Sequence, residues 1–573
     1  MIAPRNFLPQ EASQRPWEAH YPAAVPVSLH YPQRSLPFLL EHTAAKFPDR
    51  VVCHYYSQHL TYEQLLHSAR RFAAMLIREG VQPGDRVGIL LPNLPEYLIS
   101  LFGTWMAGGV VVALSPMNPR EAISSLVAKT ECKVIVSLDV LAPLMEHLEH
   151  QPELVLLTSL NDRLSWLERI GYAWVRFQRL GFGKPCPGMR VMDFNEALKS
   201  SAELEAPVAV DPEEPAYILP TGGTTGTPKA VLLSHKNLMA NAWQLRHWSM
   251  GEAGAETMLA VLPFFHSYGL SACVLNGIAM GATLVLQHRF SPAGAIRLIE
   301  QYKPTILLAV PAMLIAFIKE IRQHKHDLHS LKVCISGGAP LPKSVAEEFS
   351  ALTGCTVVEG YGLSEASPVT HAGPLDGTAV PGTIGLPLPD TEARIVDAAT
   401  GTEQLPSGEV GELIVRGPQV MLGYWKSPTE TERVLRNGWL HTGDLGTCDE
   451  NGFFRIVDRK KDLIITSGFN VYPADVESVL RNYPGVQDAA VVGVPNDDTG
   501  ETVKAILVLE SGHKFNRRNF DEFTHRHLSA QQRPKIVEAQ STDLPRNFLG
   551  KVLRRELREE GAKAAEPLAS AAP

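Results

Sequence analysis

Short apolar runs alternate with segments of helical period through much of the chain. Residues 62–79 space their apolar side chains along one helical face, and residues 86–91 form a short apolar run that Pro92 ends. Residues 97–107 again have helical spacing and residues 110–114 again form a short apolar run. The same alternation resumes between Glu214 and Val358. Strands that alternate with helices predict an α/β fold with a largely parallel sheet.

The chain has 573 residues, too many for one hydrophobic core. Residues 459–560 follow their own order of helices and strands, which predicts a small α+β domain. Residues 151–205 resemble an insertion with little strand character. The organisation expected is an N-terminal extension at 1–35, a large α/β domain at 36–458 that contains the insertion, the small domain, and a disordered tail at 561–573.

Charge and cysteine usage limit the possible partners. The formal net charge of −8 argues against nucleic acid as a partner, because such domains usually carry a basic excess. The seven cysteines are scattered and form no CxxC pair, which is typical of reduced thiols in a cytoplasmic protein. His324, His326 and His329 lie in a polar segment, where a solvated helix end is favoured over a metal site.

Residues 257–288 contain no Asp, Glu, Lys or Arg and are long enough to span a bilayer. Pro263, Gly269, Gly277 and Gly281 divide this stretch into short pieces. A buried strand, a loop and a core helix are therefore expected here instead of a transmembrane helix.

A Gly/Thr-rich turn between two apolar runs predicts a site for phosphate groups. Glycines allow backbone N–H groups to point inward at anionic oxygens, while threonine hydroxyls and a lysine add further donors. The spacing fits neither GxxxxGK[ST] nor GxGxxG, which excludes the P-loop and the dinucleotide-binding fingerprint. The residues assigned to the nucleotide are Thr221, Gly222, Gly223, Thr224, Thr225, Gly226 and Lys229.

From this turn onward the sequence resembles the adenylate-forming superfamily, which includes acyl-CoA synthetases, firefly luciferase and the adenylation domains of peptide synthetases. The resemblance covers about residues 36–560, recurs in the family's order, and identifies 36–458 as an AMP-binding domain. The further motifs that carry it lie at residues 263–269, 336–341, 359–365, 438–444, 458–462 and 545–551.

The resemblance implies ATP, Mg²⁺ and CoA as cofactor and co-substrates. Thr221, Thr224, Thr225 and Lys229 would bind the β- and γ-phosphates, and Glu365 would hold Mg²⁺ together with Thr221. Ser364 replaces the family's usual threonine but keeps the hydroxyl.

The nucleoside would lie between two further motifs. By resemblance, Gly338 and Ala339 line the adenine, and Tyr361, next to Gly362, stacks on it. Asp444 would accept hydrogen bonds from the ribose hydroxyls, and Arg459 would contact the ribose as well.

The remaining roles implied by the resemblance belong to catalysis and to the second half-reaction. Lys551 would stabilise charge that develops on the α-phosphate and the carboxylate, and Lys461 would be the hinge about which the small domain rotates. His266 is assigned to gating or positioning. The pantetheine tunnel would pass Ser467, Gly468 and Phe469.

The motifs are most similar to those of bacterial long-chain fatty acid–CoA ligases, so the expected partners are a fatty acid and CoA. A ligase for a medium-chain or aryl acid stays open, as does an enzyme that transfers the acyl group to a carrier protein or stops at the adenylate. A catalytically dead binding protein would be expected to lack Lys229, Glu365, Asp444 or Lys551, and all four are present.

A segment at residues 163–180 is amphipathic. A contact with anionic lipid at the inner face of the membrane is one interpretation, and a lid packed on the body is the preferred alternative. The oligomeric state stays open, with a homodimer as one possibility. The apolar face carries Trp166, Ile170, Ala173, Trp174 and Phe177, opposite Arg169, Arg176 and Arg179.

Overall fold

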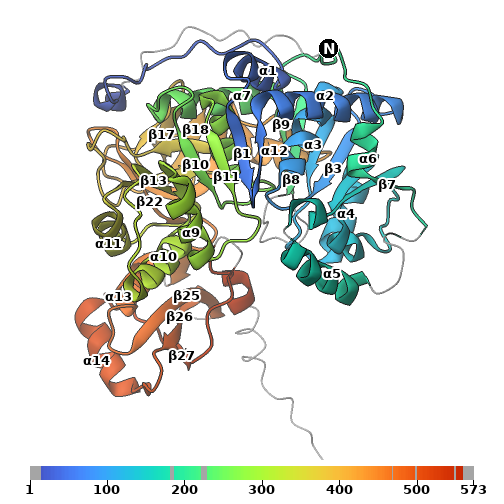
Figure 1. Ribbon diagram of the computed structural model, residues 1–573. Helices are drawn as coiled ribbons and strands as arrows, with labels where there is room; N and C mark the ends of the chain where they lie inside the picture. The colour runs from blue at the N-terminus through green and yellow to red at the C-terminus, as the bar shows by residue number, and fades with distance from the viewer. Residues whose placement is uncertain are drawn as a thin grey trace, which may run out of the picture.

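The computed structural model describes residues 15–164, 166–180, 186, 188–220, 229–466, 469–496, 500–546 and 550–558. A large body contains most of these residues, and a smaller C-terminal domain lies against it beneath helices α9 and α10 (Figure 1). This arrangement confirms the expected α/β fold with a small α+β domain.

The first sheet of the body, called here the N-terminal sheet, has the order β19-β9-β8-β4-β3-β5-β6-β7. Strands β4, β5 and β6 are buried at every position, as expected for parallel strands covered on both faces. The strands are β3 (Arg86–Leu90), β4 (Val110–Ala113), β5 (Val134–Leu138), β6 (Leu154–Thr158), β7 (Val191–Asp193), β8 (Pro215–Pro220), β9 (Ala230–Ser234) and β19 (Gly423–Tyr424).

The second sheet, the central sheet, has the order β16-β15-β14-β13-β12-β10-β11-β1-β2. From β14 to β1 neighbouring strands are parallel, so their carboxyl ends meet at one edge. The strands are β1 (Val51–Tyr55), β2 (Gln58–Thr61), β10 (Thr257–Ala260), β11 (Thr283–Leu286), β12 (Ile306–Ala309), β13 (Val333–Ser336), β14 (Thr356–Gly362), β15 (Val369–Ala372) and β16 (Leu386–Pro387).

Helices of the body pack over these two sheets and share one hydrophobic core with them. Helix α2 begins with a capping box, in which Thr61 Oγ1 accepts from Gln64 N at 3.2 Å. The helices are α1 (Pro37–Lys46), α2 (Tyr62–Arg78), α3 (Pro95–Met106), α4 (Arg120–Thr130), α5 (Trp166–Leu180), α6 (Phe194–Lys199), α7 (His235–Trp248), α8 (Asn276–Met280), α9 (Pro292–Tyr302), α10 (Pro311–Gln323), α11 (Lys343–Thr353) and α12 (Pro428–Val434).

A third, antiparallel sheet leads the chain toward the small domain. Its central strand β21 pairs with β18, β20 and β22, and β17 continues the sheet beyond β18. The strands are β17 (Glu392–Val396), β18 (Gly411–Arg416), β20 (Leu435–Arg436), β21 (Trp439–Cys448) and β22 (Phe454–Arg459).

The small domain has its own hydrophobic clusters on the two faces of its sheet. The sheet has the order β24-β23-β26-β25, with β27 parallel to β26. Its elements are β23 (Ile464–Thr466), β24 (Phe469–Val471), α13 (Pro473–Leu480), β25 (Val486–Asn496), β26 (Gly500–Leu509), α14 (Arg517–His527) and β27 (Ile536–Gln540).

The interpretation of residues 257–288 is confirmed. They form β10, a buried π-helix (Gly269–Leu275), α8 and β11. Within the described part of the chain, no helix is long and apolar enough to cross a membrane.

The expectation of little strand character at 151–205 is wrong, because β6 and β7 both belong to the N-terminal sheet. β6 pairs in parallel with β5 through five registered residue pairs. Helix α5 follows β6 in the sequence and lies below α4 in Figure 1.

Part of the expected N-terminal extension is a strap packed on the body. Trp17 is buried with its ring centroid 6.0 Å from that of Phe454. Tyr21 donates to the carbonyl of Pro387 at 2.6 Å, and the Tyr31 hydroxyl donates to Asp390 at 2.8 Å. The strap therefore joins the amino-terminal part of the chain to the antiparallel sheet.

Candidate active site

Three of the sequence motifs meet at the carboxyl edge of the central sheet. Residues 263–269 follow β10, residues 336–341 follow β13, and Tyr361 lies at the end of β14. In open α/β sheets, ligands usually bind in the crevice at this edge. The topology thus brings together segments that are nearly 100 residues apart in the sequence.

Direct contacts join these motifs. Tyr268 donates its hydroxyl to the carbonyl of Ile335 at 3.0 Å. A Cβ atom at Gly337 would lie 3.0 Å from the Tyr268 ring and 3.3 Å from the carbonyl oxygen of Gly360, so the close approach favours glycine. Gly338 has a φ of 80°, which a residue with a side chain rarely adopts. The neighbouring Ala339 continues this loop.

His266 is held as a neutral imidazole at this edge. Its Nδ1 accepts from the backbone N–H of Tyr268 at 3.2 Å, and burial lowers its pKa to about 4. An Nδ1 that accepts leaves the proton on Nε2. The ring is therefore suited to donate a hydrogen bond from Nε2 and not to act as a base through Nδ1.

Ser364 and Glu365 follow β14 and connect the central sheet to the N-terminal sheet. The Oγ atoms of Ser364 and Ser267 are 3.2 Å apart. Glu365 Oε1 accepts from the hydroxyl of Tyr424 at 2.8 Å, and its backbone carbonyl accepts from Met421 N at 2.8 Å. Gly362 lies just before them, where a Cβ atom would be 2.0 Å from the carbonyl oxygen of Pro368.

The predicted phosphate turn connects β8 to β9, which pair in antiparallel fashion. Lys229, the last residue of this turn, lies within the part of the chain that the structure describes. Its Nζ is 2.6 Å from Glu430 Oε2 and 4.9 Å from the ring centroid of Tyr424. The other predicted members lie outside the described residues, namely Thr221, Gly222, Gly223, Thr224, Thr225 and Gly226.

Asp444 is buried, and each of its carboxylate oxygens has a donor. Tyr361 donates its hydroxyl to Oδ2 at 2.6 Å, and Arg459 Nε is 2.9 Å from Oδ1. Asp444 and Arg459 are register partners on β21 and β22. Burial and the Asp444 charge raise the pKa of Tyr361, so the phenol stays a donor.

Two lysines approach the same cluster. The pKa of Lys551 is lowered to about 8, mainly by burial and then by the positive charges of Arg459 and Lys461, while the negative charge of Asp444 opposes the shift. Burial is also the main cause of the lowered pKa of Lys461, followed by the charge of Arg459. The Lys551 segment touches the body directly, since a Cβ atom at Gly550 would lie 3.0 Å from Cβ of Ala312 on α10.

The residues predicted for CoA lie at the hairpin of β23 and β24. Phe469 begins β24 and is 55% exposed, while Ser467 and Gly468 lie outside the described residues. An exposed aromatic ring beside a strand edge is available to contact a ligand.

Sequence reasoning missed the residues that hold these groups in place. Tyr424 and Glu430 contact Glu365 and Lys229. Arg554 reaches buried Glu477 at 2.7 Å and Asp462 at 3.7 Å, which ties the segment after Lys551 to the hinge motif. The dipeptide Gly-Tyr before Trp425 is the only sequence signal for Tyr424, and it carries no chemistry by itself.

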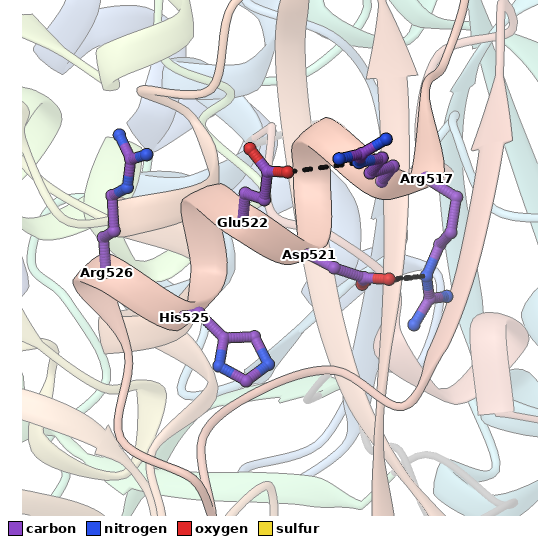
Figure 2. A pocket seen from close by; sticks show the side chains of 6 residues that line it. Arg517, Asp521, Glu522, His525 and Arg526 are labelled. Atoms are coloured by element: carbon purple, nitrogen blue, oxygen red, sulfur yellow. Dashed lines mark hydrogen bonds and ion pairs between the residues drawn. The ribbon is translucent and has the colours of Figure 1, made fainter.

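Two other features are not part of the site. A concave surface on α14 is lined by charged side chains that pair along the helix, Arg517 with Asp521 at 2.9 Å and Arg518 with Glu522 at 3.3 Å (Figure 2). Of the histidines at 324–329, His326 Nδ1 contacts Glu300 at 3.1 Å and His329 Nδ1 contacts the carbonyl of Thr353 at 3.2 Å. These contacts favour ordinary surface roles.

The family model of the AMP-binding enzymes matches residues 40–425, and that of the AMP-binding enzyme C-terminal domain matches residues 475–551. The chain belongs to the AMP-binding enzyme family. The resemblance identified from the motifs is thereby confirmed.

Several curated relatives are similar over nearly their whole length. A long-chain-fatty-acid–CoA ligase of Bacillus subtilis is 40% identical over 96% of this chain and 98% of its own. A protein of the same name from Escherichia coli is 36% identical over 95% and 98%. A feruloyl-CoA synthase of Amycolatopsis is 35% identical over 87% and 93%.

Solved structures share the fold. ATP-bound MatB from Rhodopseudomonas palustris superposes with a TM-score of 0.78, at 29% identity, over 92% of this chain and all of its own. The o-succinylbenzoate CoA synthetase MenE from Bacillus subtilis, in complex with its acyl-adenylate intermediate, gives a TM-score of 0.75 at 26% identity, over 91% and 98%.

Proposed function

We propose that this protein activates a long-chain fatty acid with ATP and joins it to CoA. The observation that carries the proposal is that the ammonium of Lys551, from the small domain, is buried within the electrostatic influence of the paired Asp444 and Arg459. A cation brought to a buried carboxylate and guanidinium suits the stabilisation of negative charge on a transferring phosphoryl group. The full-length likeness to long-chain-fatty-acid–CoA ligases supports the choice of acid.

The reaction has two steps. A carboxylate oxygen attacks the α-phosphorus of ATP, the bond to the pyrophosphate oxygen breaks, and an acyl-adenylate forms. The sulfur of CoA then attacks the acyl carbon, AMP departs, and the thiol proton is released. Lys551 would neutralise charge in the first step, and rotation about Lys461 would bring the Phe469 face to the site for the second.

The residues present fit Mg²⁺. Protein sites for this ion usually supply one or two carboxylates and leave the other positions to phosphate and water. Glu365, with its carboxylate fixed by Tyr424, would supply such a ligand, together with Thr221. The ion would neutralise charge on the departing pyrophosphate.

The experiment that tests the function measures pyrophosphate release and thioester formation with a panel of acids, with and without CoA. We expect both products with long-chain fatty acids. A maximum with acetate or an aryl acid would contradict the choice of acid, and pyrophosphate without CoA-thioester would contradict the ligase. The aryl rival is supported by the 35% identity to a feruloyl-CoA synthase, close to the 36% for the Escherichia coli relative.

Lys551→Ala separates the two steps. Loss of the ammonium should reduce acyl-adenylate formation by at least about 100-fold, the usual cost of removing a group that stabilises transition-state charge. Thioester formation from supplied acyl-adenylate and CoA should remain near the wild-type rate. Equal losses in both steps would contradict the two-state use of the small domain.

We further propose that α5 contacts an anionic membrane surface. Ile170 and Trp174 are 63% and 62% exposed, and Phe177 joins them on the same outward face. On the opposite face Tyr172 and Arg176 contact Asp139, Arg176 at 3.0 Å. The contacts of this helix with Asp139 are thus made from the face opposite the exposed aromatic side chains. Exposed aromatics on a helix that also carries arginines favour a lipid surface, where a long-chain acid also partitions.

Sedimentation with vesicles tests this contact. Wild-type protein should co-sediment with vesicles that contain anionic lipid and bind less to purely zwitterionic vesicles. Trp174→Glu should lose the binding, whereas Gln178→Glu, an exposed position on the same helix, should keep most of it. Equal binding by wild type and Trp174→Glu would refute the proposal, and a dimer that Trp174→Glu dissociates would assign the face to a second copy.

A further inference from the structure

Tyr424 lies between two groups that the sequence assigned to the triphosphate end of ATP. Its hydroxyl donates to Glu365 Oε1 at 2.8 Å, and its ring lies under the ammonium of Lys229, 4.9 Å from Nζ to the centroid. The side chain is only 7% exposed, so both contacts are made in a confined space. One tyrosine thus touches an anion and a cation that come from different segments of the chain.

The backbone fixes Tyr424 in this position. β19 pairs with β9 directly after the phosphate turn, with Tyr424 opposite Val231, and Trp425 N donates to the carbonyl of Ala230 at 2.7 Å. The N–H of Tyr424 donates to Thr431 Oγ1 at 2.9 Å, which anchors the strand to α12. The backbone that carries Tyr424 is therefore held on two sides, by β9 and by α12.

The hydroxyl can act only as a donor toward Glu365. A carboxylate oxygen only accepts hydrogen bonds, so the phenol must be the donor of this 2.8 Å contact. The bond fixes one oxygen of Glu365, and the second oxygen keeps its acceptor capacity for a cation. A hydrogen bond from a neighbour commonly orients a carboxylate that binds a metal.

We propose that Tyr424 is a positioning residue for the magnesium-bound triphosphate: its hydroxyl orients Glu365 as a metal ligand, and its ring supports the Lys229 ammonium. This inference rests on the proposed function. It predicts that Tyr424 serves the first half-reaction, in which the triphosphate is bound, and is dispensable in the second. A residue with a purely structural role would affect both half-reactions alike.

The test compares Tyr424→Phe with Tyr302→Phe. Tyr302 also donates one hydroxyl bond, at 3.0 Å to the carbonyl of Tyr56, far from the motifs of the site. We expect Tyr424→Phe to raise the Mg²⁺ concentration for half-maximal ATP–pyrophosphate exchange about tenfold, the scale of a hydrogen bond to a charged group. Tyr302→Phe should leave this concentration unchanged.

Each preparation is also assayed for thioester formation from supplied acyl-adenylate and CoA. The ratio of the two rates is independent of the fraction of folded enzyme. Tyr424→Leu, which removes the ring as well, should raise the KM for ATP by about threefold more than Tyr424→Phe because the cation–π contact is lost. Equal loss of both half-reactions, or an unchanged Mg²⁺ dependence in Tyr424→Phe, would overturn the inference.

The activity of the wild-type enzyme distinguishes a failure of this inference from a failure of the proposed function. If wild-type enzyme exchanges pyrophosphate with no acid of the panel, the proposed function fails. If it does exchange pyrophosphate and the variants match it, only the role of Tyr424 fails.

Discussion

Two carboxylates at the candidate site each accept a hydrogen bond from a tyrosine hydroxyl. Asp444 is held by Tyr361 at 2.6 Å and Glu365 by Tyr424 at 2.8 Å. Both phenols have raised pKa values and so remain donors over the working pH range. The tyrosine partners are neutral and so do not cancel the negative charge of either carboxylate; Asp444 is paired in addition with the cation Arg459.

Lys551 should give the first half-reaction an alkaline limit. The charged form of a lysine exists below its pKa, and burial lowers the pKa of Lys551 to about 8. We therefore expect kcat/KM for ATP, which reports the free enzyme, to fall as pH rises through about 8. The measurement is ATP–pyrophosphate exchange between pH 6 and pH 10.

Lys551→Arg is the matched variant for this profile. Arginine keeps its charge across the whole range, so the alkaline fall should disappear even if the plateau is lower. If wild type and Lys551→Arg lost rate at the same pH, the titration would have to be assigned to another group.

At this scale the sequence predicted a set of candidate site residues but not their mutual contacts. Tyr361 and Asp444 were both assigned to the nucleoside, 83 positions apart, and their hydrogen bond depends on how two sheets are placed. Tyr424 escaped prediction because a tyrosine in a two-residue strand has no chemical signature.

Among the elements, α5 shows what periodicity can and cannot predict. The 3.6-residue period correctly placed Ile170, Trp174 and Phe177 on one face. The period could not predict which face packs against the body. That orientation depends on Asp139, which contacts Tyr172 and Arg176 on the opposite face of the helix. In α5, contacts with a buried acidic residue, and not the area of the apolar face, determine which side packs against the body.

The segment that carries Lys551 is held to α13 and the hinge motif by Arg554. Its guanidinium lies 2.7 Å from Glu477 and 3.7 Å from Asp462, and the three side chains are 15%, 6% and 11% exposed. Arg554→Ala leaves buried carboxylates without this partner and should destabilise the small domain by about 3 kcal/mol. Urea unfolding followed by a probe in that domain measures the loss.

Arg518→Ala is the control, because Arg518 pairs with Glu522 on the exposed face of α14 (Figure 2). Exposed pairs of this kind contribute little, so no measurable change is expected. Similar shifts for both variants would show that the Arg554 network is no more important than a surface pair.

For the whole molecule, the strap at residues 15–31 joins the start of the chain to the antiparallel sheet. The alternation of helices and strands predicted the sheets well, since it is a local property, but the strap has no period and its burial follows from distant partners such as Phe454. β6 and β7 were missed for a similar reason. Whether a short segment becomes a strand depends on the neighbouring strands with which it pairs, and not on its own sequence alone.

Trp17→Ala should lower the stability of the body by about 3 kcal/mol, the usual cost of deleting a buried aromatic side chain. Trp17 is 5% exposed and packs on Phe454 and Gly452. Scanning calorimetry measures the change, with Trp174→Ala, at an exposed position, as the control. Equal melting temperatures for the two variants would contradict the structural role of the strap.

The outward face of α5 has an optical consequence. Among the tryptophans whose side chains the structure describes, Trp174 is the only one that is exposed, and the others are buried or half-buried. A water-soluble collisional quencher such as iodide should therefore reach its indole first, while the buried indoles of Trp17, Trp105 and Trp248 keep their emission. The quenched fraction of the intrinsic fluorescence therefore measures whether this face of α5 is covered.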